Sequence, residues 1–241
     1  MSVISLKAGA CGRVFDASKM YVYLRGALDG AGMEESVRAL TYMRKHHEGQ
    51  FRNDGQPYEI HPLMMACYAM SLGDGLITDS VIATILLHDV CEESNVLVEE
   101  LPFSESVQRG VKYITLTRFH NETKYEQKKR YMNELLESLE ATIAKAIDRY
   151  VNLATMPGTF SDDKMRKNVV ETDMLLLPVL KQAKYKWPQA TKLLYALRTN
   201  IRSVNDVQAI LLGVKLTDPG FVNSPHAKDY AFLVTGEACP W

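Results

Sequence analysis

Four side chains with metal-binding chemistry occur in three separate stretches of the sequence. His61 opens the run HPLMMACYAMSL, His88 and Asp89 follow the run VIATILL, and Asp148 lies inside ATIAKAIDRYVNLATM. Each run has apolar residues at helical spacing, which predicts three helices. An imidazole or a carboxylate is costly to bury without a partner. The four side chains therefore predict a metal site, and mixed nitrogen and oxygen ligands suit Mn, Fe, Zn or Co better than Mg or Ca.

Two more carboxylates, Glu92 and Glu93, follow the second group of ligands. The run VIATILLHDVCEE is expected to form one buried helix. His88 and Glu92 are four residues apart, as are Asp89 and Glu93, so all four lie within one turn. A divalent ion beside them would lower the pKa of a water molecule towards neutrality. We therefore expect Glu92 and Glu93 to orient or deprotonate that water.

The third run carries a polar stripe on an otherwise apolar helix. Asp148, Asn152 and Thr155 are four and then three residues apart, which places them on one face. Asn152 and Thr155 are therefore expected to bind substrate beside the metal, by hydrogen bonds to ribose or phosphate. Arg149 could form a surface ion pair with Asp148, but the apolar flanks of this run favour a buried position.

These stretches together resemble the HD-domain metal phosphohydrolases, and within them the alarmone hydrolase domain of the RelA/SpoT family. The three matching motifs are HEGQFRNDGQPYEIHP (47–62), LLHDVCEE (86–93) and DRYVNLAT (148–155). The likeness covers roughly residues 34–185. It implies an all-α HD-domain bundle of about 9–11 helices, with the metal ion, most simply Mn²⁺, held by His61, His88, Asp89 and Asp148.

The resemblance also implies a substrate. A guanosine tetra- or pentaphosphate (ppGpp or pppGpp) would lose its 3′-diphosphate as pyrophosphate, leaving GDP or GTP. Arg52 and Asn53 would flank the nucleobase, and an arginine can stack on a purine. The family has lysine at position 53 and aspartate at position 93, so Asn53 and Glu93 depart from its pattern. No synthetase half follows, so the chain resembles a stand-alone small alarmone hydrolase.

Two other functions remain open at this stage. The same metal chemistry could act on an adenosine alarmone or on a nucleotide 2′- or 3′-phosphate. The chain could instead be a non-catalytic antitoxin or binding partner of an alarmone synthetase, although a pure binder has no need of a water-activating pair. His47 is expected to make a structural hydrogen bond beside the site, and the polar segment 117–127 could lie over it.

The positioning elements can be outlined from periodicity and breaks. We expect an N-terminal extension (1–32) packed on the domain, an HD domain (33–200), and a C-terminal helix with an irregular tail (201–241). Ser161 is expected to cap a long helix to about residue 184, kinked by Pro178. Two shorter helices (189–201 and 204–213) should follow, and only AFLVT in the tail hints at a strand.

Composition limits the partners and the compartment. The chain of 241 residues is 46% apolar with a formal net charge of −1, so no basic excess draws it to nucleic acid or to a membrane. No apolar run reaches the ~20 residues of a membrane span. The N-terminus lacks a signal-peptide core, and the four scattered cysteines predict no disulfide framework. These features favour the reducing cytoplasm, and they leave the oligomeric state open.

Overall fold

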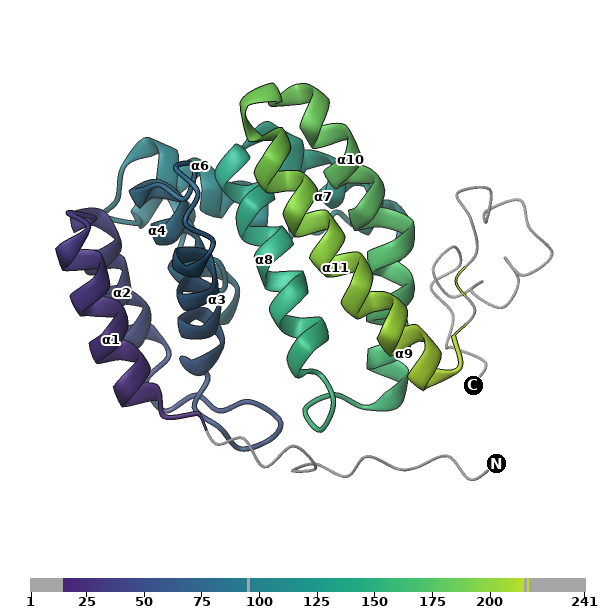
Figure 1. Ribbon diagram of the computed structural model, residues 1–241, viewed down its shortest axis with the longest axis horizontal. Helices are drawn as coiled ribbons and strands as arrows, with labels where there is room; N and C mark the ends of the chain where they lie inside the picture. The colour runs from purple at the N-terminus through teal and green to yellow at the C-terminus, as the bar shows by residue number, and fades with distance from the viewer. Residues whose placement is uncertain (1–14, 95, 215, 217–241) are drawn as a thin grey trace.

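Helices α1 (Ala17–Gly30), α2 (Glu34–His46), α3 (Ile60–Ser71) and α4 (Asp79–Leu87) form one side of the bundle (Figure 1). The computed structural model describes residues 15–94, 96–214 and 216. α1, within the predicted N-terminal extension, packs against α2 and α3. Among these four helices, α3 carries the buried His61, and α4 leads to His88.

The start of α2 is capped by a residue from another helix. Met33, its N-cap residue, makes no side-chain cap. Asp79 at the start of α4 accepts hydrogen bonds from the backbone N–H of Glu35 (3.0 Å) and of Ser36 (2.7 Å). Because a carboxylate at a helix N-terminus satisfies free N–H groups and the helix dipole, this contact fixes α2 against α4.

α8 (Leu139–Thr155) lies between the two sides of the bundle (Figure 1). It packs against α3, α4, α6 (Glu105–Ile114) and α11 (Thr191–Leu212). α4 is buried from Val81 to Leu87, and α6 approaches it closely at Gly110. A β-carbon at Gly110 would lie 2.4 Å from the Thr84 hydroxyl, so this crossing requires glycine. The helices that carry the expected ligands are thus held by one continuous core.

The other side of the bundle consists of α7 (Lys124–Glu134), α9 (Asp162–Glu171), α10 (Leu177–Lys186) and α11. A π-helical turn, Thr172–Leu176, joins α9 to α10. The remaining short elements are α5 (Val90–Glu93) and the 3₁₀ turns Val98–Glu100, Leu135–Glu137 and Pro188–Ala190. None of the described helices is both long enough and apolar enough to span a membrane.

The predicted all-α class is confirmed. Within the described ranges no strand forms, and one isolated bridge joins Phe51 and Pro57. Ser161 caps α9 as predicted by accepting from the Lys164 N–H, and the π-helical turn lies directly before Pro178, where a kink was expected. The prediction of two short helices near the end was wrong, because α11 runs unbroken through residues 201–204 and across the boundary predicted at residue 200. The AFLVT segment lies outside the described residues.

A buried ion network ties α8 to α7 and α9. Arg149, next to Asp148, is buried rather than paired on the surface, and it donates to Glu171 Oε1 at 2.6 Å. Lys128 from α7 also contacts Glu171. Burial by itself would raise the pKa of Glu171, but the cations of Arg149 and Lys128 lower it to about 2. The Glu171 carboxylate therefore stabilises the folded state as long as it is ionised.

We expect this carboxylate to make the protein acid-sensitive. Because the folded pKa of Glu171, about 2, lies below the ordinary value of 4.5 for a glutamate, its stabilising effect is complete above about pH 4.5. It is lost as the pH falls towards 2. Urea unfolding between pH 6 and pH 3 measures the effect. The variant Glu171→Gln should show a shallower loss of unfolding free energy over this range, and an unchanged slope would contradict the assignment.

Candidate metal centre

The His88–Asp89 pair forms a turn between two helices. α4 ends at Leu87, and α5 begins at Val90. The expectation of one continuous helix through Glu93 was therefore wrong. Backbone N–H groups of Glu92 and Glu93 donate to the Asp89 carbonyl, so α5 starts directly on the turn.

Three of the four expected ligands come together in the core. Ligand atoms of His61, His88 and Asp148 all lie within 4.8 Å of one another, and the three side chains are buried. Asp148 Oδ1 lies 3.1 Å from His61 Nε2 and 4.0 Å from His88 Nε2. These three side chains come from α3, from the turn after α4 and from α8.

The ring of His88 is oriented for coordination. Its Nδ1–H donates to the Ile85 carbonyl at 2.8 Å, so Nε2 carries the lone pair in the neutral ring. Nε2 is buried and has no hydrogen-bond partner. Burial by itself would lower the pKa of His88, but Asp89 and Asp148 raise it to about 9 in the absence of a cation. A buried imidazole nitrogen among carboxylates fits a divalent metal ion, whose binding would displace the proton.

Asp89 lies beside this group but is engaged elsewhere. Its Oδ2 accepts a hydrogen bond from the Tyr58 hydroxyl at 2.7 Å and lies 3.0 Å from His88 Nε2. Burial would raise the pKa of Asp89, but the charges of His88 and His61 keep the pKa below its usual range. Asp89 is thus an ionised carboxylate in contact with one of the three clustered ligands.

Asp148 is held from three directions. Besides His61, Lys145 donates to Oδ2 at 2.8 Å and Asn152 donates to Oδ1 at 2.6 Å. Although burial opposes ionisation, Lys145, His61 and His88 hold the pKa of Asp148 well below its usual range. Asn152 thus lies beside Asp148 as predicted, while Thr155 donates its hydroxyl to the Val151 carbonyl of its own helix.

Glu92 and Glu93 lie at the exposed side of the centre. Glu92 Oε1 accepts the backbone N–H of Leu116 at 2.8 Å, which connects α5 to the segment after α6. Partial burial of the Glu92 carboxyl raises its pKa, and the hydrogen bond from the Leu116 N–H partly offsets the rise. Glu93 contributes its backbone carbonyl as the acceptor of the Gln50 amide at 3.3 Å. His120, within the polar segment after α6, is exposed.

The loop that carries Arg52 and Asn53 is held against the far end of α8. Asp54 Oδ2 accepts a hydrogen bond from Thr159 at 3.0 Å, just beyond α8. Asn53 is exposed and Arg52 is half-buried. Burial lowers the pKa of Lys164, and the nearby Arg52 charge lowers it further, which places Arg52 near the start of α9.

Sequence reasoning overlooked two side chains at this centre. Tyr58 bonds Asp89, and Lys145 bonds Asp148. Lys145 lies three residues before Asp148 on α8, a spacing at which helical side chains meet, so its position carried a usable signal. Tyr58 is 31 residues from Asp89, and no local pattern predicts that contact. The predicted structural hydrogen bond of His47 is present, since its Nδ1 meets Gln50 Oε1 at 2.7 Å.

Comparison with known proteins finds relatives that match about three fifths of the chain. The guanosine-3′,5′-bis(diphosphate) 3′-pyrophosphohydrolase of Aquifex aeolicus is 31% identical over 153 residues, 61% of this chain and 21% of that protein. The Vibrio cholerae protein of the same name is 31% identical over 154 residues, again 61% and 21%. The bifunctional (p)ppGpp synthase/hydrolase SpoT of Escherichia coli is 28% identical over 149 residues, 59% and 21%. The matches thus span about a fifth of each relative's length. No protein-family model matches the chain.

Proposed function

We propose, from the premise that this chain belongs to the HD-domain hydrolase family of RelA and SpoT, that it hydrolyses guanosine 3′,5′-bis(diphosphate) and its pentaphosphate analogue. The products are GDP or GTP and pyrophosphate. The observation that carries the proposal is the buried group of His61, His88 and Asp148, whose ligand atoms all lie within 4.8 Å of one another. A hydrolase of this class needs such a group to hold its metal ion.

We assign the metal to these three side chains, with Asp89 as the fourth ligand and Mn²⁺ as the ion. Imidazole and carboxylate together suit Mn²⁺, and Fe, Co or Zn would fit the same donors. When bound, the ion would polarise a phosphoryl oxygen and acidify a water molecule. Lys145 helps to keep Asp148 ionised, and the hydrogen bonds from Lys145 and Tyr58 orient Asp148 and Asp89.

Glu92 is the residue that we assign to proton transfer. Its raised pKa suits a general base better than that of an ordinary surface carboxylate, because a base works best when its pKa is near the working pH. The hydrogen bond from Leu116 fixes the direction of the carboxylate. Glu93, whose backbone is held by Gln50, is assigned a supporting role in orienting the water.

One assay tests the substrate. Purified protein with Mn²⁺ should release pyrophosphate from the guanosine 3′,5′-bis(diphosphate), with GDP as the nucleotide product resolved by chromatography. Equal or faster turnover of an adenosine alarmone or of a nucleotide 2′- or 3′-phosphate would assign the same chemistry to another substrate. Binding of an alarmone synthetase without turnover of any nucleotide would contradict the enzyme assignment.

We expect Arg52→Ala to raise KM and to leave kcat nearly unchanged. In the proposed complex Arg52 stacks on the guanine, far from the reacting phosphorus, so it binds ground state and transition state alike. A cation over an aromatic face contributes about 0.5–2 kcal/mol, which corresponds to a roughly 2- to 30-fold change. Steady-state kinetics with the tetraphosphate measure both constants.

Asn53→Lys is the matched variant on the same loop. It restores the side chain of the family and should lower KM or leave it unchanged, without altering kcat. Arg52→Ala with an unchanged KM and a lowered kcat would remove this loop from the base-binding site. The proposed preference for a guanosine substrate would then be supported only by the similarity to the relatives.

A further inference from the structure

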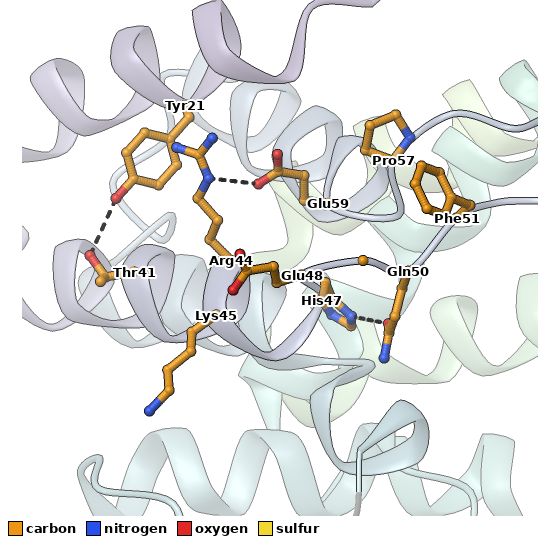
Figure 2. A pocket seen from close by; sticks show the side chains of 11 residues that line it. Tyr21, Thr41, Arg44, Lys45, His47, Glu48, Gln50, Phe51, Pro57 and Glu59 are labelled. Carbon is orange, nitrogen blue, oxygen red and sulfur yellow. Dashed lines mark hydrogen bonds and ion pairs between the residues drawn. The ribbon is translucent and has the colours of Figure 1, made fainter.

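The loop of residues 50–58 is closed at its base and joined there to the metal centre. Phe51 and Pro57 form an isolated antiparallel bridge, and Figure 2 shows these two residues side by side. The next residue, Tyr58, donates its hydroxyl to Asp89 at 2.7 Å. These contacts hold the base of the loop, but they do not reach its tip, which carries the arginine proposed to bind guanine.

The tip of this loop is a tight turn. The Arg52 N–H donates to the Gln56 carbonyl at 2.8 Å, and the Gly55 N–H donates to the Arg52 carbonyl at 2.9 Å. Gly55 has a φ of 81°, in the left-handed region that favours glycine. The turn fixes the shape of the tip, but by itself it does not fix where the tip lies relative to α8.

One side chain joins the tip to the segment after α8. The Asp54 carboxylate accepts the backbone N–H and the side-chain amide of Gln56, each at 3.1 Å. Its Oδ2 also accepts the Thr159 hydroxyl at 3.0 Å, across 105 residues of sequence. The same hydroxyl lies 3.1 Å from the Thr155 carbonyl, but its single proton goes to the charged acceptor, because charge-assisted hydrogen bonds are stronger. Thr159 therefore ties the tip to the end of α8.

The hydrogen bonds of Asp54 also leave Arg52 without a carboxylate partner. Asp54 is only two residues from Arg52, so an unbound Asp54 carboxylate would be a ready ion-pair partner for it. The donors from Gln56 and Thr159 hold this carboxylate elsewhere. The Arg52 guanidinium makes no hydrogen bond or ion pair with the part of the chain that the structure describes, and the charge near it is a second cation, Lys164. Arg52 is therefore available to a ligand.

We propose that Thr159 is a positioning residue for the nucleotide. By holding the Asp54 carboxylate, Thr159 fixes the tip of the loop against α8 and keeps Asp54 from pairing with Arg52. This inference rests on the proposed function, in which Arg52 stacks on the guanine. Because α8 also carries Asp148, one helix sets the position of a metal ligand and, through Thr159, the position of the arginine.

Thr159→Val should raise KM and leave kcat nearly unchanged. Valine has the shape of threonine without the hydroxyl, so the released Asp54 carboxylate can pair with Arg52. The rise should not exceed the roughly 2- to 30-fold rise expected for Arg52→Ala, because Thr159 acts only through Arg52. In an Arg52→Ala background, Thr159→Val should therefore cause no further rise. Steady-state kinetics with the tetraphosphate and Mn²⁺ measure both constants.

Three further variants separate positioning from a general loss of structure. Thr159→Ser keeps the hydroxyl and should keep the KM of the unmodified protein. Asp54→Asn, combined with Thr159→Val, removes the charge that would capture Arg52 and should return KM towards that value. Thr199→Val is the matched control, because it removes an exposed hydroxyl from α11. It should change neither constant.

Cleavage by trypsin after Arg52 tests the contact without any hydrolysis assay. Mass spectrometry of the full chain gives the initial rate of cleavage between Arg52 and Asn53. Thr159→Val should be cleaved there roughly tenfold faster than the unmodified protein, the scale of one hydrogen bond to a charged group. The reason is that a released tip opens more often. Thr199→Val should be cleaved at the unmodified rate.

Each part of the inference can be overturned separately. Equal cleavage rates in Thr159→Val and the unmodified protein would overturn the contact. An unchanged KM in Thr159→Val, or the same further rise in the Arg52→Ala background, would overturn the positioning role. An unchanged KM in Arg52→Ala would remove Arg52 from base binding, and with it this role of Thr159. A protein that hydrolyses no guanosine alarmone contradicts the proposed function, whereas the cleavage rates still decide the contact.

Discussion

His88→Ala is expected to abolish both Mn²⁺ binding and turnover. The variant removes a buried ligand nitrogen that lies 3.0 Å from Asp89 Oδ2, on a ring oriented by the Ile85 carbonyl. Asp148 would then remain buried beside Lys145 and His61 alone. The loss of a ligand should exceed the roughly 10- to 100-fold loss that follows removal of a residue supporting a ligand.

Calorimetric titration with Mn²⁺ and pyrophosphate release measure the two effects separately. His120→Ala is the matched control for metal binding, because this histidine is exposed and lies outside the clustered ligands. Urea unfolding should show that His88→Ala still folds. A folded His88→Ala protein that retains full activity, or full activity in metal-stripped protein, would overturn the metal assignment.

Glu92→Gln is expected to lower kcat by ~10²-fold or more while the metal stays bound, the scale of a lost general base. A glutamine retains an oxygen that can accept the Leu116 N–H, so the contact between α5 and the segment after α6 should persist. The amide cannot take a proton from water, and this is the property that the variant removes. Single-turnover rates together with Mn²⁺ affinity distinguish a lost base from a lost ligand.

Glu93→Asp is the companion variant. It restores the side chain of the family and leaves the backbone carbonyl that Gln50 binds, so near-normal rates are expected. Glu93→Gln should be slower than Glu93→Asp if its carboxylate helps to orient the water. Near-normal rates in Glu92→Gln would move the base to another residue.

The sequence by itself determined the helical class and the residues that meet at the centre. Apolar periodicity over residues 61–71 and around Asp148 predicts helices whatever the rest of the fold, because the pattern is local. The 3.6-residue repeat alone likewise predicts the polar stripe on α8, and Asn152 does donate a hydrogen bond to Asp148. Three motifs in one order then supplied the likeness to the family.

Only the tertiary structure decided how the helices begin and end around the ligands. The apolar run to Leu87 continues into HDVCEE without glycine or proline, so periodicity alone predicts one helix there. From the turn at His88–Asp89, Asp89 contacts Tyr58 of the loop before α3, and His88 contacts Asp148 of α8. The opposite error occurred in α11, where no break forms at residues 201–204.

The sequence alone also could not predict the electrostatic environment of the buried carboxylates. Whether a buried carboxylate is ionised depends on the charges that reach it in space, and these come from distant segments. Arg149 and Glu171 are 22 residues apart, and Tyr58 and Asp89 are 31 apart. Their pairing follows from the packing of α8 against α9 and of the loop before α3 against the turn after α4, because only a folded core brings these groups together.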